Sequence, residues 1–307
     1  MGDHIAVLSN PFAGKGRGRA AAEGAVAHLR AHGVAVREYA GSSAEDTRSL
    51  AATALAAEPT ALVVVGGDGT LSGILDVVVA TTVPVVLVPA GTGNDFARAL
   101  GLPRRDIAAA AELAVGGRVR AVDVGEVRSG ERRSLFLTVA ALGFDARVSD
   151  RTNRLRWPRG GARYYLALLI ELARLHPVTF TIACDDDAPV IAPGTLVAVG
   201  NTASYGGGMP VAAGAAPDDG QLDVVQVTPL GRLRLLRLFP LLLQGRHLDR
   251  PEVTHRRAVR VRISAPDLVV YADGERVGED ECTITVRPAA LRVLVPRDDP
   301  STTEVHA

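Results

Sequence analysis

The chain has 307 residues, and its 34 Lys and Arg balance 34 Asp and Glu, so the formal net charge is zero. This length suits two domains, and a hydrophobic content of 47% excludes a mostly disordered chain. A dedicated nucleic-acid binder would carry a surplus of basic residues to neutralise phosphates, so we expect no nucleic-acid partner.

Cysteine usage and hydropathy narrow the class of protein further. Cys184 and Cys282 are far apart and match no metal-binding spacing, which predicts a reducing compartment without a disulfide framework. The N-terminal residues lack the pattern of a secretion signal, and the sequence contains no run of about 18 uncharged apolar residues. We therefore expect a cytoplasmic protein.

The first part of the chain alternates predicted strands and helices. Apolar runs predict strands over 5–8, 34–39, 61–65 and 84–88, and helices are predicted over 20–31, 44–57 and 71–80. Strands without apolar–polar alternation, separated by helices, indicate a parallel sheet covered on both faces. Ligands bind such sheets outside the carboxyl ends of the strands, where this chain has glycine-rich loops.

After Asp123 the pattern changes to short strands rich in β-branched residues, which predict a mainly antiparallel β domain. The predicted strands are a hairpin over 127–141 and the segments 179–184, 195–199, 222–227, 259–263, 268–272, 283–286 and 291–295, interrupted by helices over 162–175 and 230–244. The fold class is thus an α/β domain over 1–124 and a β-rich domain over 125–295. The segment 296–307 is a candidate addition to the first domain.

The loop Gly66-Gly67-Asp68-Gly69-Thr70 directly follows a buried strand. Glycines let the backbone approach a phosphate chain closely and turn its N–H groups toward it, and a following helix adds its positive end. Asp68 is an acid where an anion would bind, which makes sense if a metal ion lies between the carboxylate and the phosphates. The alternative is a tight strand-to-helix turn with Asp68 as a cap.

A second loop, from Ser9 to Gly16, follows the first strand. It is not a Walker A motif, because Gly16 follows Lys15 where that motif needs Ser or Thr. The residues from Gly16 to Ala21 fit a dinucleotide-binding pattern with Glu38 further on, but the strand ends too early for the tight turn that this pattern requires. Lys15 is the only lysine and the stronger candidate, with an ordinary surface lysine as the alternative.

A third loop, from Pro89 to Arg98, again joins glycines and small polar side chains after a strand. Asn94 or Asp95 could cap a helix that starts at Phe96, and a capping role is compatible with a ligand-binding one. Because the carboxyl ends of parallel strands lie at one edge of a sheet, we expect the three loops to converge.

Six segments together carry a family resemblance. They are N-P-x-x-G-K at 10–15, G-G-D-G-T at 66–70, P-x-G-T-x-N-D-F-A at 89–97, N-x-x-x-Y-G-G-G-M at 201–209, P-D-D-G-x-L-D at 217–223 and D-G-E at 273–275. In this order, and over almost the whole chain, the sequence resembles the diacylglycerol kinase catalytic family of lipid kinases, above all its soluble bacterial members. Sphingosine and ceramide kinases are related, and NAD kinases, which share G-G-D-G-T, are more distant.

The resemblance implies an ATP-binding first domain and a lipid-binding second domain. Nucleotide contacts would come from Asn10, Pro11, Phe12, Ala13, Gly14 and Lys15, from Ser42 or Ser43, from Gly66, Gly67, Asp68, Gly69, Thr70, Leu71 and Ser72, and from Thr92. Asp68 would lie at the Mg²⁺ of the nucleotide. Relatives usually continue G-G-D-G-T with x-Asn-Glu, where this chain has Ser72 and Gly73, so any contact made by that Asn and Glu is not carried over.

The resemblance also implies a catalytic carboxylate and a second metal site. Glu275 matches the catalytic residue of the family, with Asp273 beside it, and would accept the proton of the lipid hydroxyl. Asp219 would bind a structural Mg²⁺, helped by the backbone carbonyls of Ala216 and Gln221. Taken as residues alone, the Asp-Gly pairs at both places are strong turn signals.

The expected substrate is a membrane lipid, most directly diacylglycerol converted to phosphatidic acid. A kinase of the same fold for another lipid or a soluble alcohol, and a non-catalytic nucleotide-sensing regulator, are the alternatives. The stretch 230–244 places arginines among leucines, so it could lie on an anionic bilayer or pack as a core helix, and a basic segment with Trp157 precedes Tyr164. We expect peripheral contact with a membrane surface, and a homodimer remains open.

Overall fold

The computed structural model describes residues 3–10, 13–155, 157 and 161–297, and the chain divides into two compact units. Unit 1 runs up to Asp123 and resumes at Ala289, and unit 2 comprises Val124–Pro288. The chain enters unit 2 within strand β5 (Arg118–Ser129) and leaves it within strand β14 (Glu275–Val295). The return to unit 1 therefore begins at Ala289, earlier than residue 296, where the sequence suggested it.

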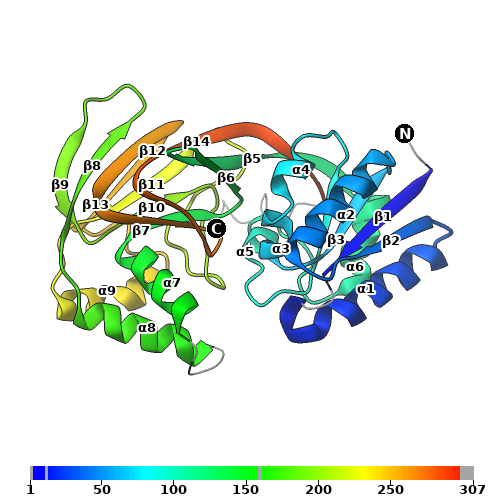
Figure 1. The fold of residues 1–307 in the computed structure, drawn as a ribbon, viewed down its shortest axis with the longest axis horizontal. Helices are drawn as coiled ribbons and strands as arrows, with labels where there is room; N and C mark the ends of the chain where they lie inside the picture. The colour runs from blue at the N-terminus through cyan, green and yellow to red at the C-terminus, as the bar shows by residue number, and fades with distance from the viewer. Residues whose placement is uncertain (1–2, 11–12, 156, 158–160, 298–307) are drawn as a thin grey trace, which may run out of the picture. The chain divides into compact units, whose positions relative to one another are not determined.

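Unit 1 is built on a parallel sheet with the strand order β2-β1-β3-β4-β14 (Figure 1). Its first four strands are β1 (His4–Ser9), β2 (Ala35–Ala40), β3 (Ala61–Gly66) and β4 (Val85–Pro89). Helices α1 (Ala13–Ala31) and α6 (Ile107–Gly116) pack together, as do α2 (Ala44–Ala56) and α4 (Leu75–Val78), and Figure 1 shows the two pairs on opposite faces of the sheet. Every residue of β1 and β3 is buried, because helices cover both faces. The predicted α/β fold of this part is confirmed.

Two helices of unit 1 differ from the sequence expectation. Helix α1 begins at Ala13 rather than Ala20, so Gly14, Lys15 and Gly16 lie in its first turns and not in a loop. The single helix expected over 71–80 is two short helices, α3 (Asp68–Ser72) and α4, separated at Gly73 and Ile74. The glycine loop after β3 therefore turns helical at Asp68, three residues before the predicted start.

Unit 2 is mainly antiparallel, as the sequence predicted. Its main sheet has the order β12-β11-β10-β7-β13-β14, while β5 pairs with β6 and β14, and β8 pairs with β9 and β13. The remaining strands are β6 (Arg132–Phe136), β7 (Val139–Gly143), β8 (Val178–Cys184), β9 (Val190–Gly194), β10 (Leu196–Gly200), β11 (Leu222–Val227), β12 (Val253–Ala258) and β13 (Arg260–Ala272). Its largest core cluster combines side chains from most of these strands, including Phe136, Phe180 and Ile263.

In the described part of this unit, the sheet is accompanied by the helices α7 (Phe144–Arg154), α8 (Gly161–Ala173) and α9 (Arg232–Leu243). Only α8 and α9 were predicted, because α7 is rich in charged residues and buries few apolar ones. Strands β9 and β12 were also missed, since four of the five residues of β9 and most of β12 are partly or fully exposed and β12 reads largely polar. Strands β13 and β14 each join two segments predicted as separate strands.

Candidate functional site

The loops after β3 and β4 meet backbone to backbone in unit 1. A Cβ atom on Gly67 would lie 2.9 Å from Gly91 Cα, and one on Gly91 would lie 2.6 Å from Gly67 Cα. The Ala90 N–H donates to the Gly66 carbonyl over 2.7 Å. Because neither Gly67 nor Gly91 has room for a side chain, only glycine permits this approach. The structure thus brings two of the predicted loops together.

Asp68 is the first residue of α3 and links these loops through its side chain. Its Oδ2 accepts the N–H of Asp95 over 2.5 Å, and Asp95 is the first residue of α5 (Asp95–Ala99). The expectation that Asn94 or Asp95 caps a helix starting at Phe96 is wrong: the helix starts at Asp95, and Asn94 precedes it without a capping hydrogen bond. The carboxylate of Asp68 supplies that acceptor from the neighbouring loop instead.

Asn94 marks the same place with a buried acceptor. Its backbone is left-handed, with φ of 53°, and its Nδ2 donates to the Gly91 carbonyl over 3.2 Å. Its Oδ1 is buried and has no hydrogen-bond partner among the described residues, and it lies 2.7 Å from the position of a Cβ on Gly91. A buried amide oxygen in this state calls for a donor such as a ribose hydroxyl or a metal-bound water. Bare glycine backbone beside this oxygen and the Asp68 carboxylate fits a nucleotide with its Mg²⁺.

The loop after β1 approaches the same edge of the sheet. The Asn10 N–H donates to the Val65 carbonyl over 3.2 Å, which ties the end of β1 to β3. A Cβ on Gly18 would lie 2.2 Å from the Asn10 carbonyl oxygen, so α1 packs directly on this loop. Of the other predicted contacts here, Pro11 and Phe12 lie outside the described residues, as does the side chain of Lys15.

The remaining predicted nucleotide contacts have distinct local roles. Ser42 donates through its N–H and its hydroxyl to Asp46 Oδ2 over 2.7 and 2.8 Å, whereas Ser43 Oγ accepts the Asp46 N–H as the N-cap of α2. Both serines are exposed, and the choice between them stays open. Thr92 is exposed, but the Leu71 side chain is fully buried, so Leu71 offers a ligand only its backbone.

In unit 2, Asp273 and Gly274 form the two-residue turn between β13 and β14. Both have left-handed backbones, with φ of 48° and 86°, as hairpin turns of this length require. Asp273 Oδ2 accepts the Leu137 N–H over 2.8 Å, and its Oδ1 accepts the N–H and the hydroxyl of Thr138 over 2.9 and 2.5 Å. These hydrogen bonds make Asp273 a clamp between the turn and the segment before β7.

Unlike the carboxylate of Asp273, that of Glu275 has no partner in the described part of the protein. Glu275 opens β14 opposite Ala272, it is exposed, and its side chain forms no hydrogen bond or ion pair with any described residue. The clamp on Asp273, together with a 3.3 Å hydrogen bond from Asn153 Nδ2 to the Gly274 carbonyl, fixes the turn beside it. A carboxylate held on a rigid turn and open to solvent can serve as a proton acceptor.

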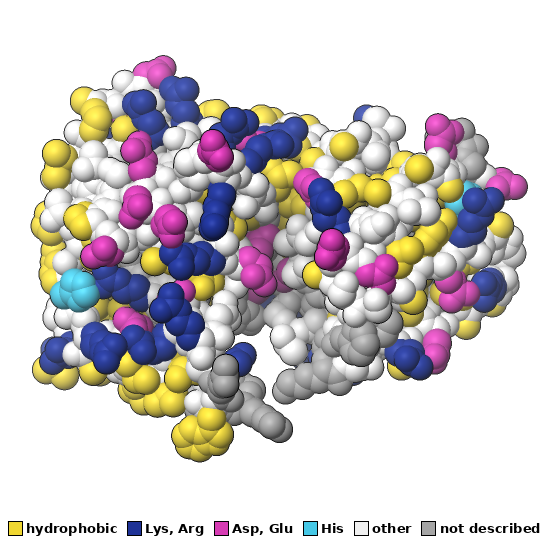
Figure 2. All heavy atoms as spheres, in the orientation of Figure 1, with side chains coloured by type: hydrophobic (Ala, Val, Ile, Leu, Met, Phe, Trp, Pro, Cys, Tyr) yellow, Lys and Arg dark blue, Asp and Glu magenta, His cyan; other side chains and the backbone are white. Residues whose placement is uncertain are grey.

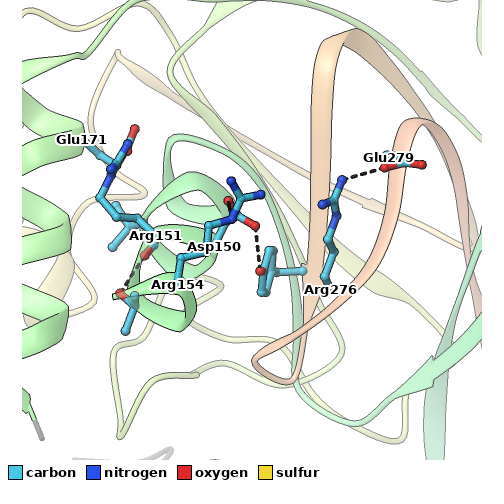
Figure 3. A network of polar contacts seen from close by, with 9 residues as sticks. Asp150, Arg151, Arg154, Glu171, Arg276 and Glu279 are labelled. Atoms are coloured by element: carbon cyan, nitrogen blue, oxygen red, sulfur yellow. Dashed lines mark hydrogen bonds and ion pairs between the residues drawn. The ribbon is translucent and has the colours of Figure 1, made fainter. Parts of the chain in front are cut away.

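Polar contacts around α7 flank this hairpin. Asp150 accepts the Tyr271 hydroxyl over 3.1 Å and pairs with Arg154 over 3.0 Å, and Arg276 of β14 pairs with Glu279 over 2.6 Å (Figure 3). Arg151 pairs with Glu171 of α8 in the same network. Burial, followed by the bond to Asp150, raises the pKa of Tyr271. The sequence gave no sign of these pairs, because the helix that carries Asp150 and Arg154 was not predicted.

The segment from Asn201 to Met209 forms hydrogen bonds with two parts of unit 2, the segment before β7 and the first turn of α7. Asn201 is buried and donates through Nδ2 to the Leu137 carbonyl over 2.9 Å, so it holds the same segment as Asp273. Three glycines with φ of 63°, 93° and 107° then turn the chain between Tyr205 and Met209. The Tyr205 hydroxyl donates to Asp145 Oδ2 over 2.5 Å.

An apolar cavity of about 110 Å³ lies in unit 2 behind α9. Its lining is nearly all hydrophobic and comes mainly from α7, α8, α9, β10, β11, β12 and the loop after Tyr205, with the polar side chains of Asp145, Tyr164, Tyr205 and His247 among it. Burial raises the pKa of Asp145 to about 6, against a lowering by the Tyr205 hydrogen bond. His247 Nε2 bonds the Val211 carbonyl over 2.8 Å, and burial lowers the pKa of this imidazole. The sequence carried no sign of this cavity, because its walls come from segments far apart in the chain.

At Asp219, where a structural metal site was predicted, the carboxylate is paired with an arginine side chain of the same chain. Asp219 Oδ1 accepts the Gln221 N–H over 3.0 Å, and Oδ2 forms an ion pair with Arg257. An Mg²⁺ bound by Asp219 with the carbonyls of Ala216 and Gln221 would have to displace this guanidinium. The donor set as it stands therefore does not fit a divalent cation, and the site stays a prediction.

Comparison with known proteins supports both halves of this description. Residues 4–127 match the model of the diacylglycerol kinase catalytic domain, and residues 138–295 match the YegS C-terminal NAD kinase beta sandwich-like domain. A diacylglycerol kinase of Mycobacterium tuberculosis is 43% identical over 294 residues, covering 95% of each chain. The crystal structure of a diacylglycerol kinase from Bacillus anthracis has a TM-score of 0.72 at 21% identity, covering 96% of this chain and 97% of that one.

A more distant likeness extends to an NAD kinase from Archaeoglobus fulgidus whose structure was solved with ATP. It has a TM-score of 0.53 at 14% identity and covers 97% of this chain and 94% of that one, which shows a common fold. Three observations point to the same family. They are the glycine loops that meet in the parallel-sheet unit, the Asp-Gly-Glu hairpin held by Asp273, and the 43% identity to the mycobacterial kinase. The chain therefore belongs to the diacylglycerol kinase catalytic family, with a YegS-type C-terminal domain, and is a diacylglycerol kinase-like lipid kinase.

Proposed function

We propose that this kinase transfers the γ-phosphoryl group of ATP to the free hydroxyl of diacylglycerol and releases phosphatidic acid. The observation that supports a lipid acceptor is the cavity behind α9, whose walls are almost entirely apolar. Such a lining suits an acyl chain and offers little to a soluble sugar or polyol, which would need several polar partners.

The chemistry divides between the two sets of residues already described. The glycine loops offer backbone N–H groups to the phosphates, and Asp68 would hold the Mg²⁺ of the nucleotide. Bound Mg²⁺ neutralises charge on the phosphates during transfer. Glu275 accepts the hydroxyl proton as the lipid oxygen bonds to the γ-phosphorus, and the bond from that phosphorus to ADP breaks. Asp273 contributes by holding the turn that presents Glu275.

Helix α9 gives the lipid a route from a membrane, because it is apolar on two faces. Leu235, Leu238 and Leu242 line the cavity. Leu233 and Leu243 point outward, 72% and 55% exposed. The inner face thus agrees with the expectation of a core helix, and we propose that the exposed face contacts a bilayer. No helix among the described residues meets the length and hydropathy needed to span a bilayer.

The charge beside this outer face favours an anionic surface. Arg232, Arg234 and Arg237 lie on α9 among its leucines, and all three are exposed. The Arg237 side chain forms no ion pair or hydrogen bond with a described residue, whereas Arg234 pairs with Glu252. Figure 2 shows hydrophobic side chains along the lower edge of unit 2, over α8 and α9, with basic side chains next to them. We therefore propose a cytoplasmic enzyme that docks this face, formed by α9 and the exposed Leu169 of α8, on anionic lipid.

An assay with radiolabelled ATP against dispersed lipids tests the acceptor. We expect label in phosphatidic acid from diacylglycerol, and none from glycerol. Faster labelling of ceramide, sphingosine or a soluble alcohol would assign the same chemistry to that acceptor. ATP binding without transfer to any acceptor would favour a nucleotide-sensing regulator.

Co-sedimentation with vesicles tests the docking face. Leu233→Asp combined with Leu243→Asp should abolish binding to phosphatidylglycerol vesicles, and Arg237→Gln should weaken it. Ile191→Asp is the matched control, because Ile191 is 71% exposed on β9. Equal binding by the wild type and the double variant would overturn the assignment of this face, while lipid kinase activity in detergent micelles would remain as a separate test of the acceptor.

A further inference from the structure

Two histidines and a glutamate converge on the outer side of unit 1, away from the glycine loops. His28 lies in the last turn of α1, His32 lies in the turn directly after this helix, and Glu112 lies on α6, which packs against α1. His28 Nε2 lies 2.7 Å from Glu112 Oε2, and His32 Nε2 lies 3.9 Å from the same oxygen. One ligand atom from each residue falls within 4.8 Å of the others, a convergence that no other group of His, Cys, Asp and Glu reaches in the described part of the chain.

The hydrogen bonds of this cluster indicate which ring nitrogen of each histidine carries the proton. His32 Nδ1 lies 2.9 Å from the His28 carbonyl, which can only accept, so Nδ1 carries the proton and the neutral ring presents a bare Nε2 to the cluster. Backbone bonds of this kind orient histidine ligands in metal sites. His28 Nε2 donates to Glu112, so a metal bound at this nitrogen requires the other tautomer of the neutral ring, with its proton on Nδ1. The side chains are 23%, 49% and 43% exposed, which leaves an ion free access.

We propose that His28, His32 and Glu112 bind one transition-metal ion of the Zn²⁺ type, with water completing its coordination. Two imidazole nitrogens and one carboxylate oxygen are a donor set that suits Zn²⁺ and disfavours Mg²⁺, which prefers oxygen ligands. Metal bonds of about 2.0–2.2 Å place tetrahedral ligand atoms about 3.3 Å apart. The two distances to Glu112, 2.7 and 3.9 Å, bracket this value, so small rotations of exposed side chains complete the site.

The bound ion would join α1 to α6. Because α1 begins at Ala13, directly after the loop that follows β1, the ion would stabilise the helix that packs on this loop through Gly18. This site is independent of the proposed kinase chemistry, since none of its residues belongs to the glycine loops or to the Asp-Gly-Glu hairpin.

Calorimetric titration of the whole protein with ZnCl₂ tests the proposal. The wild type should bind one Zn²⁺ per chain, unaffected by excess Mg²⁺, and its melting temperature should rise with Zn²⁺. His28→Ala with His32→Ala should lose this binding, and Glu112→Gln should weaken it. His176→Ala, a histidine of unit 2, should bind like the wild type.

Two results would overturn the assignment. Undiminished one-to-one binding by the folded double variant would place the ion elsewhere. No binding by the wild type would leave His28 and Glu112 as an ordinary hydrogen bond between two helices. Cobalt titration adds a readout besides stability, because a tetrahedral site with nitrogen ligands gives Co²⁺ a strong visible absorption that the double variant should lack.

Discussion

The glycine loops of unit 1 and the Asp-Gly-Glu hairpin of unit 2 are built in opposite ways. In the loops the close contact is between backbones, and Gly67 and Gly91 approach until no Cβ fits. At the hairpin the backbone follows an ordinary turn, and the two acidic side chains differ. Asp273 accepts hydrogen bonds on both carboxylate oxygens, whereas the Glu275 side chain has no hydrogen bond or ion pair among the described residues. The first region should therefore be sensitive to added atoms, and the second to the loss of single functional groups.

The sharpest test of this contrast is Glu275→Gln, which keeps shape but removes the proton acceptor. We expect kcat to fall about 10²–10⁴-fold while ATP affinity and melting temperature are unchanged, because the exposed carboxylate supports no described contact. Glu281→Gln, an exposed site on the same strand, is the control. Steady-state kinetics and calorimetric ATP titration separate the two effects. Equal losses in turnover and in ATP binding would contradict a role as base.

Gly67→Ala probes the opposite region with a single methyl group. The new Cβ would lie 2.9 Å from Gly91 Cα, and relief requires backbone movement at both loops, at a cost of about 1–3 kcal/mol in stability. We expect loss of measurable ATP binding together with a lowered melting temperature. Gly69→Ala lies two residues away, where a Cβ meets nothing within 4 Å, and should keep near-normal binding. Similar behaviour of the two variants would show that close packing of these loops is dispensable.

Asp273→Asn asks whether the two acids of the hairpin have distinct roles. An amide in place of the carboxylate turns an NH₂ group toward donors at Leu137 or Thr138, so the protein should lose about 1–3 kcal/mol of unfolding free energy. Chemical denaturation measures this loss. Glu275→Gln should show no such loss. A fully stable but inactive Asp273→Asn variant would mean that the base is Asp273 and that the two assignments are reversed.

How far the sequence predicted each region follows from the same contrast. Contiguous apolar strands and glycine loops are local patterns, so the parallel sheet and two of its loops were predicted at the correct places. What local patterns could not show is that the Asp68 side chain, and not Asn94 or Asp95, meets the start of α5, because this pairing spans 27 positions.

The second unit shows where single-sequence patterns stop. Its strands were largely found, but α7 was missed, since its polar sequence is held as a helix by tertiary contacts and ion pairs such as Arg151 with Glu171. The cavity was missed as well, because Asp145, Tyr205 and His247 are separated in the chain and meet only after folding. The D-G-E motif was visible, yet the division of roles between Asp273 and Glu275 depends on Leu137 and Thr138, which no local motif includes.

The smallest expected effect is that of Asp145. It changes the stability of unit 2 only over part of the pH range and does not concern the chemistry. The pKa of this buried carboxyl rises from 3.8 to about 6 because burial disfavours its charge, although the Tyr205 hydroxyl partly offsets this. Between these two values the folded state binds more protons than the unfolded state. Stability should therefore fall as the pH rises from about 4 to about 6, and stay lower above that range.

Asp145→Asn removes the charge and retains an acceptor for Tyr205, so the variant should be more stable than the wild type by about 1–2 kcal/mol at about pH 8. The difference should disappear near pH 4, where the native carboxyl is itself neutral. Denaturant titrations at several pH values measure this, with the exposed Asp249→Asn as the control. A gain that is the same at every pH would reflect better packing of the amide, and the buried charge would then carry no stability cost.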